Sequence, residues 1–144
     1  MIVNKKARYQ YEVIERWEAG IVLKGSEVKS IRDGRVSFVD SFAQIKRGEI
    51  FLHNLHIDPY PFDHNPGYEP RRERKLLLHK KEIERLTGTL AQKGLTLIPL
   101  SIYFKKGRAK VEIGLAKGKR LYDKRRKLRE RAVDQEIKRV LKDK

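Results

Sequence analysis

The run from Gly114 to Arg120, GLAKGKR, is the part of this chain that comes nearest to a known reaction motif. It superficially resembles a P-loop, in which backbone N–H groups cradle phosphates and a Ser or Thr hydroxyl binds magnesium. Three residues separate its glycines where the motif needs four, and Arg120 stands in place of the Ser or Thr. The sequence therefore argues against nucleotide hydrolysis.

Four histidines and no cysteine are the remaining candidates for metal or nucleophilic chemistry. His53 and His56 are three residues apart, a spacing that turns the two rings to opposite faces of a strand and favours structural or surface roles. Nothing beyond their presence gives His64 or His79 a catalytic role. The lack of Cys excludes disulfides and thiolate metal sites. We expect no metal, no cofactor, no small-molecule substrate and no catalytic residue.

Two carboxylates, Glu18 and Glu27, could in principle form an acid/base pair, but solvated groups or counter-ions of basic neighbours are favoured. Glu18 follows Trp17 at a strand bend in a basic protein. A carboxylate accepts hydrogen bonds from nucleobase amino groups, which gives Glu18 a use on an RNA surface.

Basic residues recur at the expected strand ends and loops. The clusters are Lys5, Lys6 and Arg8; Arg71, Arg72, Arg74 and Lys75; Lys80 and Lys81; and Lys105, Lys106, Arg108 and Lys110. The aromatic residues among them are Tyr9, Tyr11, Tyr60, Phe62 and Tyr68. Cationic surfaces with aromatic platforms suit single strands or folded RNA loops better than a regular duplex groove. The alternative for any one lysine is solubility.

The net charge of +16 and the 38% of charged residues indicate a polyanionic partner, either nucleic acid or an anionic membrane face. A membrane is the weaker choice because no apolar run approaches the ~20 residues that a span needs. The N-terminus shows no apolar signal-peptide region, so we expect a cytosolic protein. The 144 residues fit one domain, 1–116, followed by a tail, 117–144.

The tail contains 13 of the 35 Lys and Arg residues and has a net charge of +8. A segment this charged buries too little apolar surface to order itself, so we expect it to be disordered in the free protein. Wound as a helix, its apolar stripe breaks partway, although helix formers abound and no Gly or Pro follows Gly118. We expect a helix that forms on an anionic partner; the alternative is a solvated terminal helix or frayed end.

Hydrophobic periodicity predicts the elements of the domain. The expected strands are one from Tyr9 to Leu23 with a bulge or bend at Gly20, two in 36–57 turning at Lys46 to Glu49, a buried run at Leu76 to Leu78, and two in 95–116 turning at Lys106-Gly107. The expected helices are one in 24–34, with Ser26 as N-cap and Gly34 at C′, and one from Ile83 to Gly94. Residues 2–8 form a polar lead-in, and the proline-rich 58–70 is a surface loop. Six strands in so small a domain favour a closed antiparallel β-barrel.

Three long segments resemble one family. NKKARYQYEVIERWEAGIVLKGSEVKSIRDGR, ERKLLLHKKEI and LIPLSIYFKKGRAKVEIGLAKGKRLYDKR are similar to the SsrA-binding protein family, also called small protein B. The resemblance runs from Asn4 to about Arg131. It implies a mainly β fold, a six-stranded antiparallel barrel related to the oligonucleotide-binding fold, with about three short helices.

The resemblance also implies a function. Family members bind the tRNA-like domain of transfer-messenger RNA and deliver it, with elongation factor Tu and GTP, to stalled ribosomes for trans-translation, which tags the nascent peptide for degradation. Their tail enters the decoding region and message channel of the small subunit and becomes helical there. A ribosomal or general RNA-binding structural protein is the main alternative, and an RNA-processing enzyme would need a metal or acid/base centre.

By position, the resemblance places RNA contacts at Asn4, Lys5, Glu18, Leu77, His79 and Lys110, to which we add the neighbouring cations Lys6 and Arg8. Ribosome contacts are expected in the tail at Lys117, Gly118, Lys119, Arg120, Asp123, Lys124 and Arg125. Two positions depart from the family. His79 stands where relatives often have Asn, and Val133 stands where some have Trp, which removes a stacking group.

Overall fold

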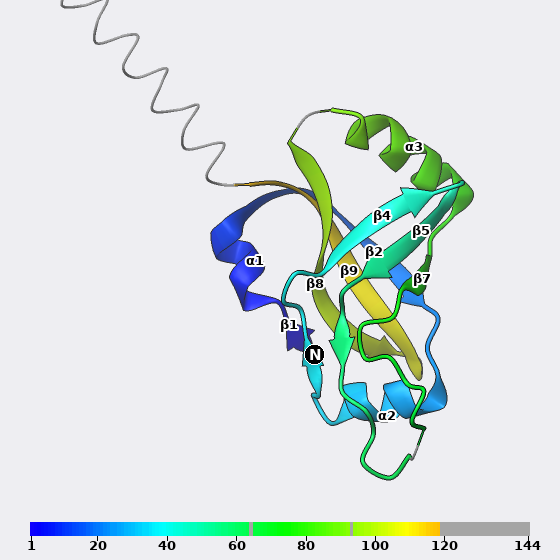
Figure 1. Cartoon of the computed structure of the whole chain (residues 1–144). Coiled ribbons are helices and arrows are strands. Elements are labelled where there is room, and N and C mark those ends of the chain that lie inside the picture. The colour runs from blue at the N-terminus through cyan, green and yellow to red at the C-terminus, as the bar shows by residue number, and fades with distance from the viewer. Residues whose placement is uncertain (64, 93, 119–144) are drawn as a thin grey trace, which may run out of the picture.

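Strands are the most frequent regular structure in the computed structural model, which describes residues 1–63, 65–92 and 94–118 (Figure 1). The strands are β1 (Ile2–Val3), β2 (Tyr11–Ile21), β3 (Val36–Ser37), β4 (Phe42–Lys46), β5 (Glu49–His53), β6 (His56–Ile57), β7 (Arg74–Leu77), β8 (Leu95–Lys105) and β9 (Arg108–Gly118). The helices are α1 (Lys5–Gln10), α2 (Gly25–Arg32) and α3 (Lys80–Leu90).

Six of the strands close into a ring. Their order is β8, β4, β5, β7, β2, β9, and β9 pairs back with β8, with every pairing antiparallel. The short β1 adds to the outer side of β8, and β3 and β6 form a separate two-stranded sheet. The expected mainly β fold with six antiparallel strands and three helices is confirmed.

Two tight turns set the register of the long hairpins. Arg47 and Gly48 both have positive φ, 52° and 75°, and so do Lys106 and Gly107, 52° and 76°. Two consecutive residues with positive φ make a type I′ turn, whose twist matches that of the flanking strands. Both hairpins were expected at these positions, and both are confirmed.

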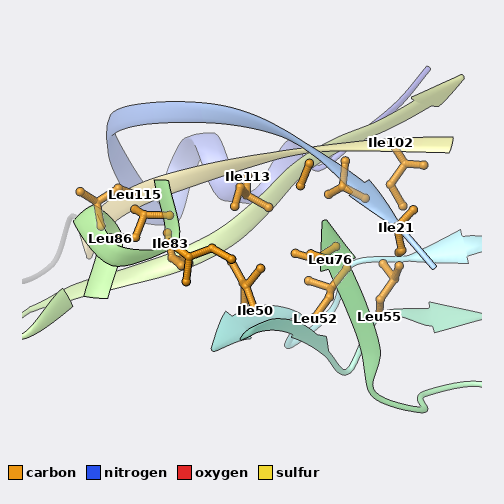
Figure 2. Close-up of a cluster of buried hydrophobic side chains, with 14 of the residues drawn as sticks. Ile21, Ile50, Leu52, Leu55, Leu76, Ile83, Leu86, Ile102, Ile113 and Leu115 are labelled. Atoms are coloured by element: carbon orange, nitrogen blue, oxygen red, sulfur yellow. The ribbon is translucent and has the colours of Figure 1, made fainter. Parts of the chain in front are cut away.

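The hydrophobic core fills the ring. Inward side chains from all six strands of the ring meet there, including Ile50, Leu52, Leu76, Ile102 and Ile113 (Figure 2). Helices cover the two ends of the ring in Figure 1, with α3 at the top and α2 at the bottom. The helix α3 contributes Ile83 and Leu86 to the core and α2 contributes Ile31. Because these side chains are buried in the core, only the outward-facing side chains of the strands are available to a partner.

The N-terminal segment differs from the expectation. Residues 2–8 were expected to be a polar lead-in, with the first strand starting at Tyr9, but 5–10 form α1 and Tyr9 is 81% exposed. The reason is a second small cluster on the outside of the ring, where Ala7 packs with Ile98, Leu100 and Ala116. The helix was not expected, because the alternation of apolar residues from Tyr9 onward predicted a strand there.

Four smaller expectations need correction. The bulge of β2 lies between Val13 and Glu15 and not at Gly20, which is regularly paired on both sides. The N-cap of α2 is Lys24 and not Ser26, and Glu27 Oε1 accepts from the Lys24 N–H at 2.8 Å; Gly34 after the helix has φ 73°, as expected. The run Leu76 to Leu78 is not uniformly buried, because the strand alternates and leaves Leu77 52% exposed. The strand β9 extends to Gly118, so Lys117 and Gly118 belong to the sheet, where Gly118 pairs with Tyr11.

Candidate nucleic-acid interface

Four residues expected to contact RNA line one hollow of about 650 Å³: Glu18, Leu77, His79 and Lys110. The sheet brings them together, because β2 lies between β7 and β9. Gly20 on β2 pairs with Leu77 on one side and with Lys110 on the other. His79 follows β7 as the N-cap residue of α3.

Gly20 leaves room for the Leu77 side chain at the edge of the hollow. A Cβ at this position would lie 3.2 Å from Leu77 Cβ, which is tighter than ordinary packing. The absence of that carbon lets Leu77 lean over the strand while staying half exposed. Leu77, together with Trp17 and Leu78, therefore supplies an apolar part to a hollow that Glu18, His79 and Lys110 make polar elsewhere.

Glu18 is oriented by Tyr103, a residue that the sequence reading did not single out. The Tyr103 hydroxyl donates to Glu18 Oε2 at 2.5 Å, and Lys105 Nζ donates to Oε1 at 3.5 Å. The hydrogen bond from Tyr103 and the nearby Lys105 and Lys110 lower the pKa of Glu18. Partial burial and the bond to Glu18 raise the pKa of Tyr103 to about 12. Glu18 is thus an ionised acceptor with a fixed direction.

The tip of the β8–β9 hairpin continues this surface. A second hollow of about 360 Å³ is lined by Glu18 together with Lys105, Lys106, Arg108 and Lys110. Tyr103 pairs with Lys110 across the two strands, which explains how one hairpin contributes both the orienting hydroxyl and the cations. A single acid among four cations can direct base N–H donors while its neighbours attract phosphates.

The N-terminal residues form a separate group. Asn4, Lys5 and Lys6 line a hollow of about 420 Å³ between α1 and residues 36–41. Asn4 Nδ2 donates to Pro99 O at 2.8 Å and Asn4 N to Leu100 O at 2.8 Å, so this amide also fastens the N-terminus to β8. Arg8 lies in the last turn of α1. The structure thus divides the expected contacts between two places.

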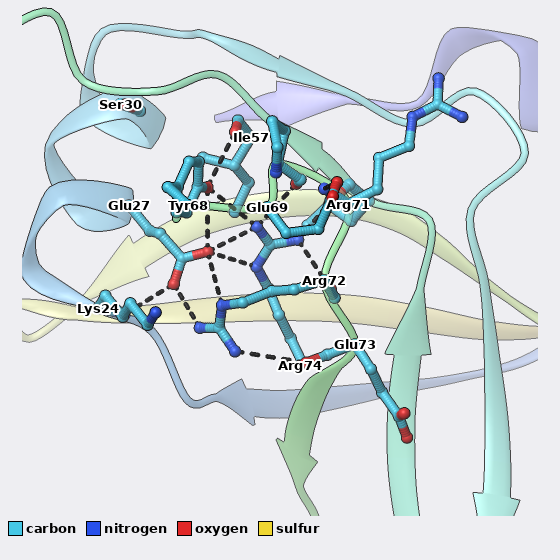
Figure 3. Close-up of polar contacts among 12 residues, drawn as sticks. Lys24, Glu27, Ser30, Ile57, Tyr68, Glu69, Arg71, Arg72, Glu73 and Arg74 are labelled. Atoms are coloured by element: carbon cyan, nitrogen blue, oxygen red, sulfur yellow. Dashed lines mark hydrogen bonds and ion pairs between the residues drawn. The ribbon is translucent and has the colours of Figure 1, made fainter. Parts of the chain in front are cut away.

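One basic cluster is partly internal. Arg74 has no exposed surface, and its guanidinium binds the equally buried Glu27 at 2.6 Å (Figure 3). Arg72 also pairs with Glu27. Burial works to raise the pKa of Glu27, but hydrogen bonds from Arg72, Lys24 N–H and Arg74 outweigh it and lower the pKa. Counting Arg74 with the RNA-facing cations was wrong, whereas Glu27 as a counter-ion of basic neighbours is confirmed.

The histidine pair has separate surroundings. The His53 ring stacks on Phe42 at 5.1 Å, while His56 Nε2 lies 2.8 Å from Asp58 Oδ1. Among the residues that the structure describes, no group of three or more His, Asp or Glu side chains could hold a metal ion. Within the same residues no helix is long and apolar enough to cross a membrane. The expected contacts at Lys119, Arg120, Asp123, Lys124 and Arg125 lie outside the described residues.

A closed six-stranded ring with cations and an oriented carboxylate on its outer face defines a small β-protein that binds polynucleotides. Comparison with known proteins agrees with this class: residues 1–143 match the family model described as SmpB protein. An SsrA-binding protein of Geobacter sulfurreducens is 55% identical over 141 residues, covering 98% of this chain and 92% of the relative. One from Acidothermus cellulolyticus is 58% identical over 138 residues, covering 96% and 87%. The chain belongs to the SmpB family.

A solved structure is also similar to this chain. It is described as "tmRNA-SmpB: a journey to the center of the bacterial ribosome", and the matching chain is 55% identical with a TM-score of 0.70. The match covers 81% of this chain and 82% of that one. The two chains are therefore similar in sequence as well as in fold.

Proposed function

We propose that the protein binds transfer-messenger RNA and acts with it on stalled ribosomes in trans-translation, so that the nascent peptide is tagged for degradation. Membership of the SmpB family, matched over residues 1–143, is the observation that carries this proposal. The surface supplies a physical reason, because Glu18, Leu77, His79 and Lys110 converge on one hollow beside a cationic hairpin tip.

Each group has a role that follows from its chemistry. Lys110 and the hairpin cations contact phosphates, which supply most of the affinity and fix the position of the RNA. The Glu18 carboxylate accepts from base N–H groups, and Leu77 covers an apolar base edge or face. The imidazole of His79 donates or accepts one hydrogen bond at the rim of the hollow. Asn4, Lys5, Lys6 and Arg8 contact a separate part of the same RNA.

Further parts of the proposal concern partners beyond the RNA. Elongation factor Tu with GTP associates through the RNA and not through the protein surface. Residues 119–144, together with the end of β9, contact ribosomal RNA in the decoding region and message channel of the small subunit and become helical there. A ribosomal partner also places the protein in the cytoplasm.

Binding of the full chain to transfer-messenger RNA tests the proposal. Lys110→Gln should lower affinity several-fold and reduce the slope of log K against log salt by about 0.7 to 0.9, the value for one phosphate contact. Lys46→Gln is the matched control, because this exposed lysine lies on the β4–β5 hairpin, where it pairs with Glu73. Failure of the wild-type protein to prefer transfer-messenger RNA over tRNA would overturn the proposal. Co-sedimentation with all ribosomal subunits, and not with stalled ones, would indicate a ribosomal structural protein instead.

A further inference from the structure

Two aromatic rings lie on the loop that follows β6, outside the three hollows described above. Phe62 is 81% exposed, and its ring meets Tyr60 edge-on, with centroids 5.5 Å apart and planes at 61°. Lys29 of α2 places its ammonium 5.4 Å from the centre of the Tyr60 ring. An open aromatic face with a cation beside it is the local arrangement that stacks unpaired bases.

The loop is anchored where it leaves β6. Ser30 Oγ of α2 donates to Asp58 O at 2.8 Å, and Asp58 N donates to Arg35 O at 3.0 Å. Asp63 N then donates to Tyr60 O at 3.0 Å, which closes a turn with Phe62 inside it. Hydrogen bonds therefore hold the start of the loop against α2 and close the backbone around Phe62 into a turn.

The buried ion pair anchors the other end of the loop. Arg74 donates to Pro70 O at 2.9 Å, and the Tyr68 hydroxyl donates to Ile57 O at 2.9 Å and to Glu27 at 3.2 Å (Figure 3). Both ends of the loop thus connect to Glu27 or its neighbours on α2. A ring presented on an anchored loop loses less entropy on binding than one on a free loop.

The end of α2 contacts β8 near the β8–β9 hairpin tip. The guanidinium of Arg32, at the end of α2, lies 5.1 Å from the ring of Phe104 on β8. Phe104 packs against the core, whereas the next residue, Lys105, lines the hollow shared with Glu18, so the two side chains lie on opposite faces of β8. In Figure 1 the β8–β9 hairpin tip lies above α2 and the 58–63 loop lies below it. The α2 cations and the cations of the hairpin tip therefore lie on elements that contact each other.

Acidic groups face the same surface and limit its charge. Asp58 is already engaged by His56 at 2.8 Å and by Arg35 at 3.8 Å. Asp33 and Asp63 are exposed and sit at the end of α2 and after Phe62. The surface is consequently less cationic than the hairpin tip, and its aromatic face contributes more to affinity than its charge.

We propose that Phe62, Tyr60, Lys29 and Arg32 form a further contact for transfer-messenger RNA, in which an unpaired base stacks on Phe62 and the α2 cations neutralise adjacent phosphates. This rests on the proposed function, since it adds a second contact for the same RNA. A phenyl ring has no hydrogen-bonding group, so the contact accepts a base by its π-face and not by its identity.

Substitutions that keep size or apolarity separate stacking from simple burial. Phe62→Leu in the full chain should weaken binding to transfer-messenger RNA about five- to tenfold, the low end of the loss per stacked base, with an unchanged salt slope. Phe62→Trp should preserve or improve affinity. Lys29→Gln should instead reduce the salt slope by about 0.7. Ultraviolet crosslinking of the wild-type complex should join the RNA to a peptide containing residues 60–62.

The possible failures are distinguishable. If wild-type protein binds transfer-messenger RNA normally while Phe62→Leu binds equally well and residues 60–62 do not crosslink, the contact at Phe62 is refuted and the proposed function stands. If Phe62→Leu impairs only ribosome association, the surface faces a ribosomal component and the proposal is likewise overturned. If the wild-type protein shows no preference for transfer-messenger RNA, the proposed function itself fails.

Discussion

Glu18 is an anion on a surface made mostly of cations, and Tyr103 determines which way its carboxylate points. The hydroxyl occupies Oε2 and Lys105 approaches Oε1, so each oxygen keeps a lone pair on its outer side. A freely rotating carboxylate would instead pair with whichever cation approached. The fixed orientation makes Glu18 suited to base N–H donors at one place on the RNA.

Tyr103→Phe is therefore expected to weaken binding to transfer-messenger RNA about three- to tenfold, because one hydrogen bond to a charged group is lost. The salt slope should not change, since no phosphate contact is removed. In a double-mutant cycle with Glu18→Gln the two losses should be less than additive, because both variants disable the same acceptor. Fluorescence anisotropy titrations measure all four affinities. Fully additive losses would show that Tyr103 acts independently of Glu18.

Glu27 has the opposite setting, an ion pair inside the protein with stability as its main consequence. Glu27→Gln leaves Arg74 buried without its anion and should cost about 3–5 kcal/mol of unfolding free energy. Glu49→Gln is the control, since the exposed pair of Glu49 with Lys75 at 3.3 Å should change stability by less than about 1 kcal/mol. Urea unfolding of the three proteins measures the difference. Equal stabilities would mean that Glu27 can be replaced without strain.

The same carboxylate makes stability depend on pH. The pKa of Glu27 is lower in the folded protein, so its stabilising contribution is complete above its unfolded pKa and is lost as pH falls through the folded value. The wild-type melting temperature should therefore fall in acid more steeply than that of Glu27→Gln. Parallel acid curves for the two proteins would assign the acid sensitivity to other groups.

At the scale of elements, the long strands could be predicted from the sequence, whereas the helix α1 on the outside of the ring could not. Ile98, Leu100, Ile102 and Phe104 alternate before Lys106-Gly107, and Val111, Ile113 and Leu115 alternate after it. Both strands and their turn therefore follow from period and turn chemistry. The helix α1 was missed because only Ala7 of its residues is buried, which leaves no helical apolar stripe to detect. Long-range packing against Ile98, Leu100 and Ala116 decides its position.

Candidate site residues show the same division. Lys110 and Glu18 carry charges that a sequence reading can notice, and the family resemblance supplied Leu77 and His79. The alternation of apolar residues in its strand did not single out Tyr103. Only the pairing of both β8 and β2 with β9 explains how its hydroxyl reaches Glu18. Arg74 looked like surface charge, because nothing local indicates a buried anion 47 residues away.

Two glycines with opposite surroundings test the packing of these elements. A Cβ on Gly114 would lie 2.9 Å from Leu100 Cδ1 and 3.1 Å from Val13 Cγ1, so Gly114→Ala should destabilise the protein by about 1–3 kcal/mol. Gly88 in α3 has no atom within 4 Å of an added Cβ, so Gly88→Ala should stabilise by about 0.5–1 kcal/mol. Thermal unfolding of both variants measures the two signs. A neutral Gly114→Ala would show that Leu100 has room to move.

For the whole molecule, the net charge is shared equally between residues 1–116 and residues 117–144. Residues 117–144 carry +8 of the total +16, in less than one fifth of the length. In the ring, the strand register places cations at fixed positions around Glu18, and α1 carries a second group of cations. The terminal segment holds the same charge at far higher density, which favours contact with a second polyanion after the ring has bound the first.

Truncation after Gly118 separates the two parts at the last residue of β9, so the ring keeps every strand pairing that the structure describes. The truncated protein should bind transfer-messenger RNA with an affinity close to that of the full chain, because the Glu18 hollow and the hairpin tip remain. It should support no peptide tagging on stalled ribosomes, since the segment proposed to contact the small subunit is gone. Filter binding and an in vitro tagging assay measure the two properties, with the melting temperature as a check on folding. A parallel loss of RNA affinity and tagging would show that both parts grip the same RNA and would refute the division of labour.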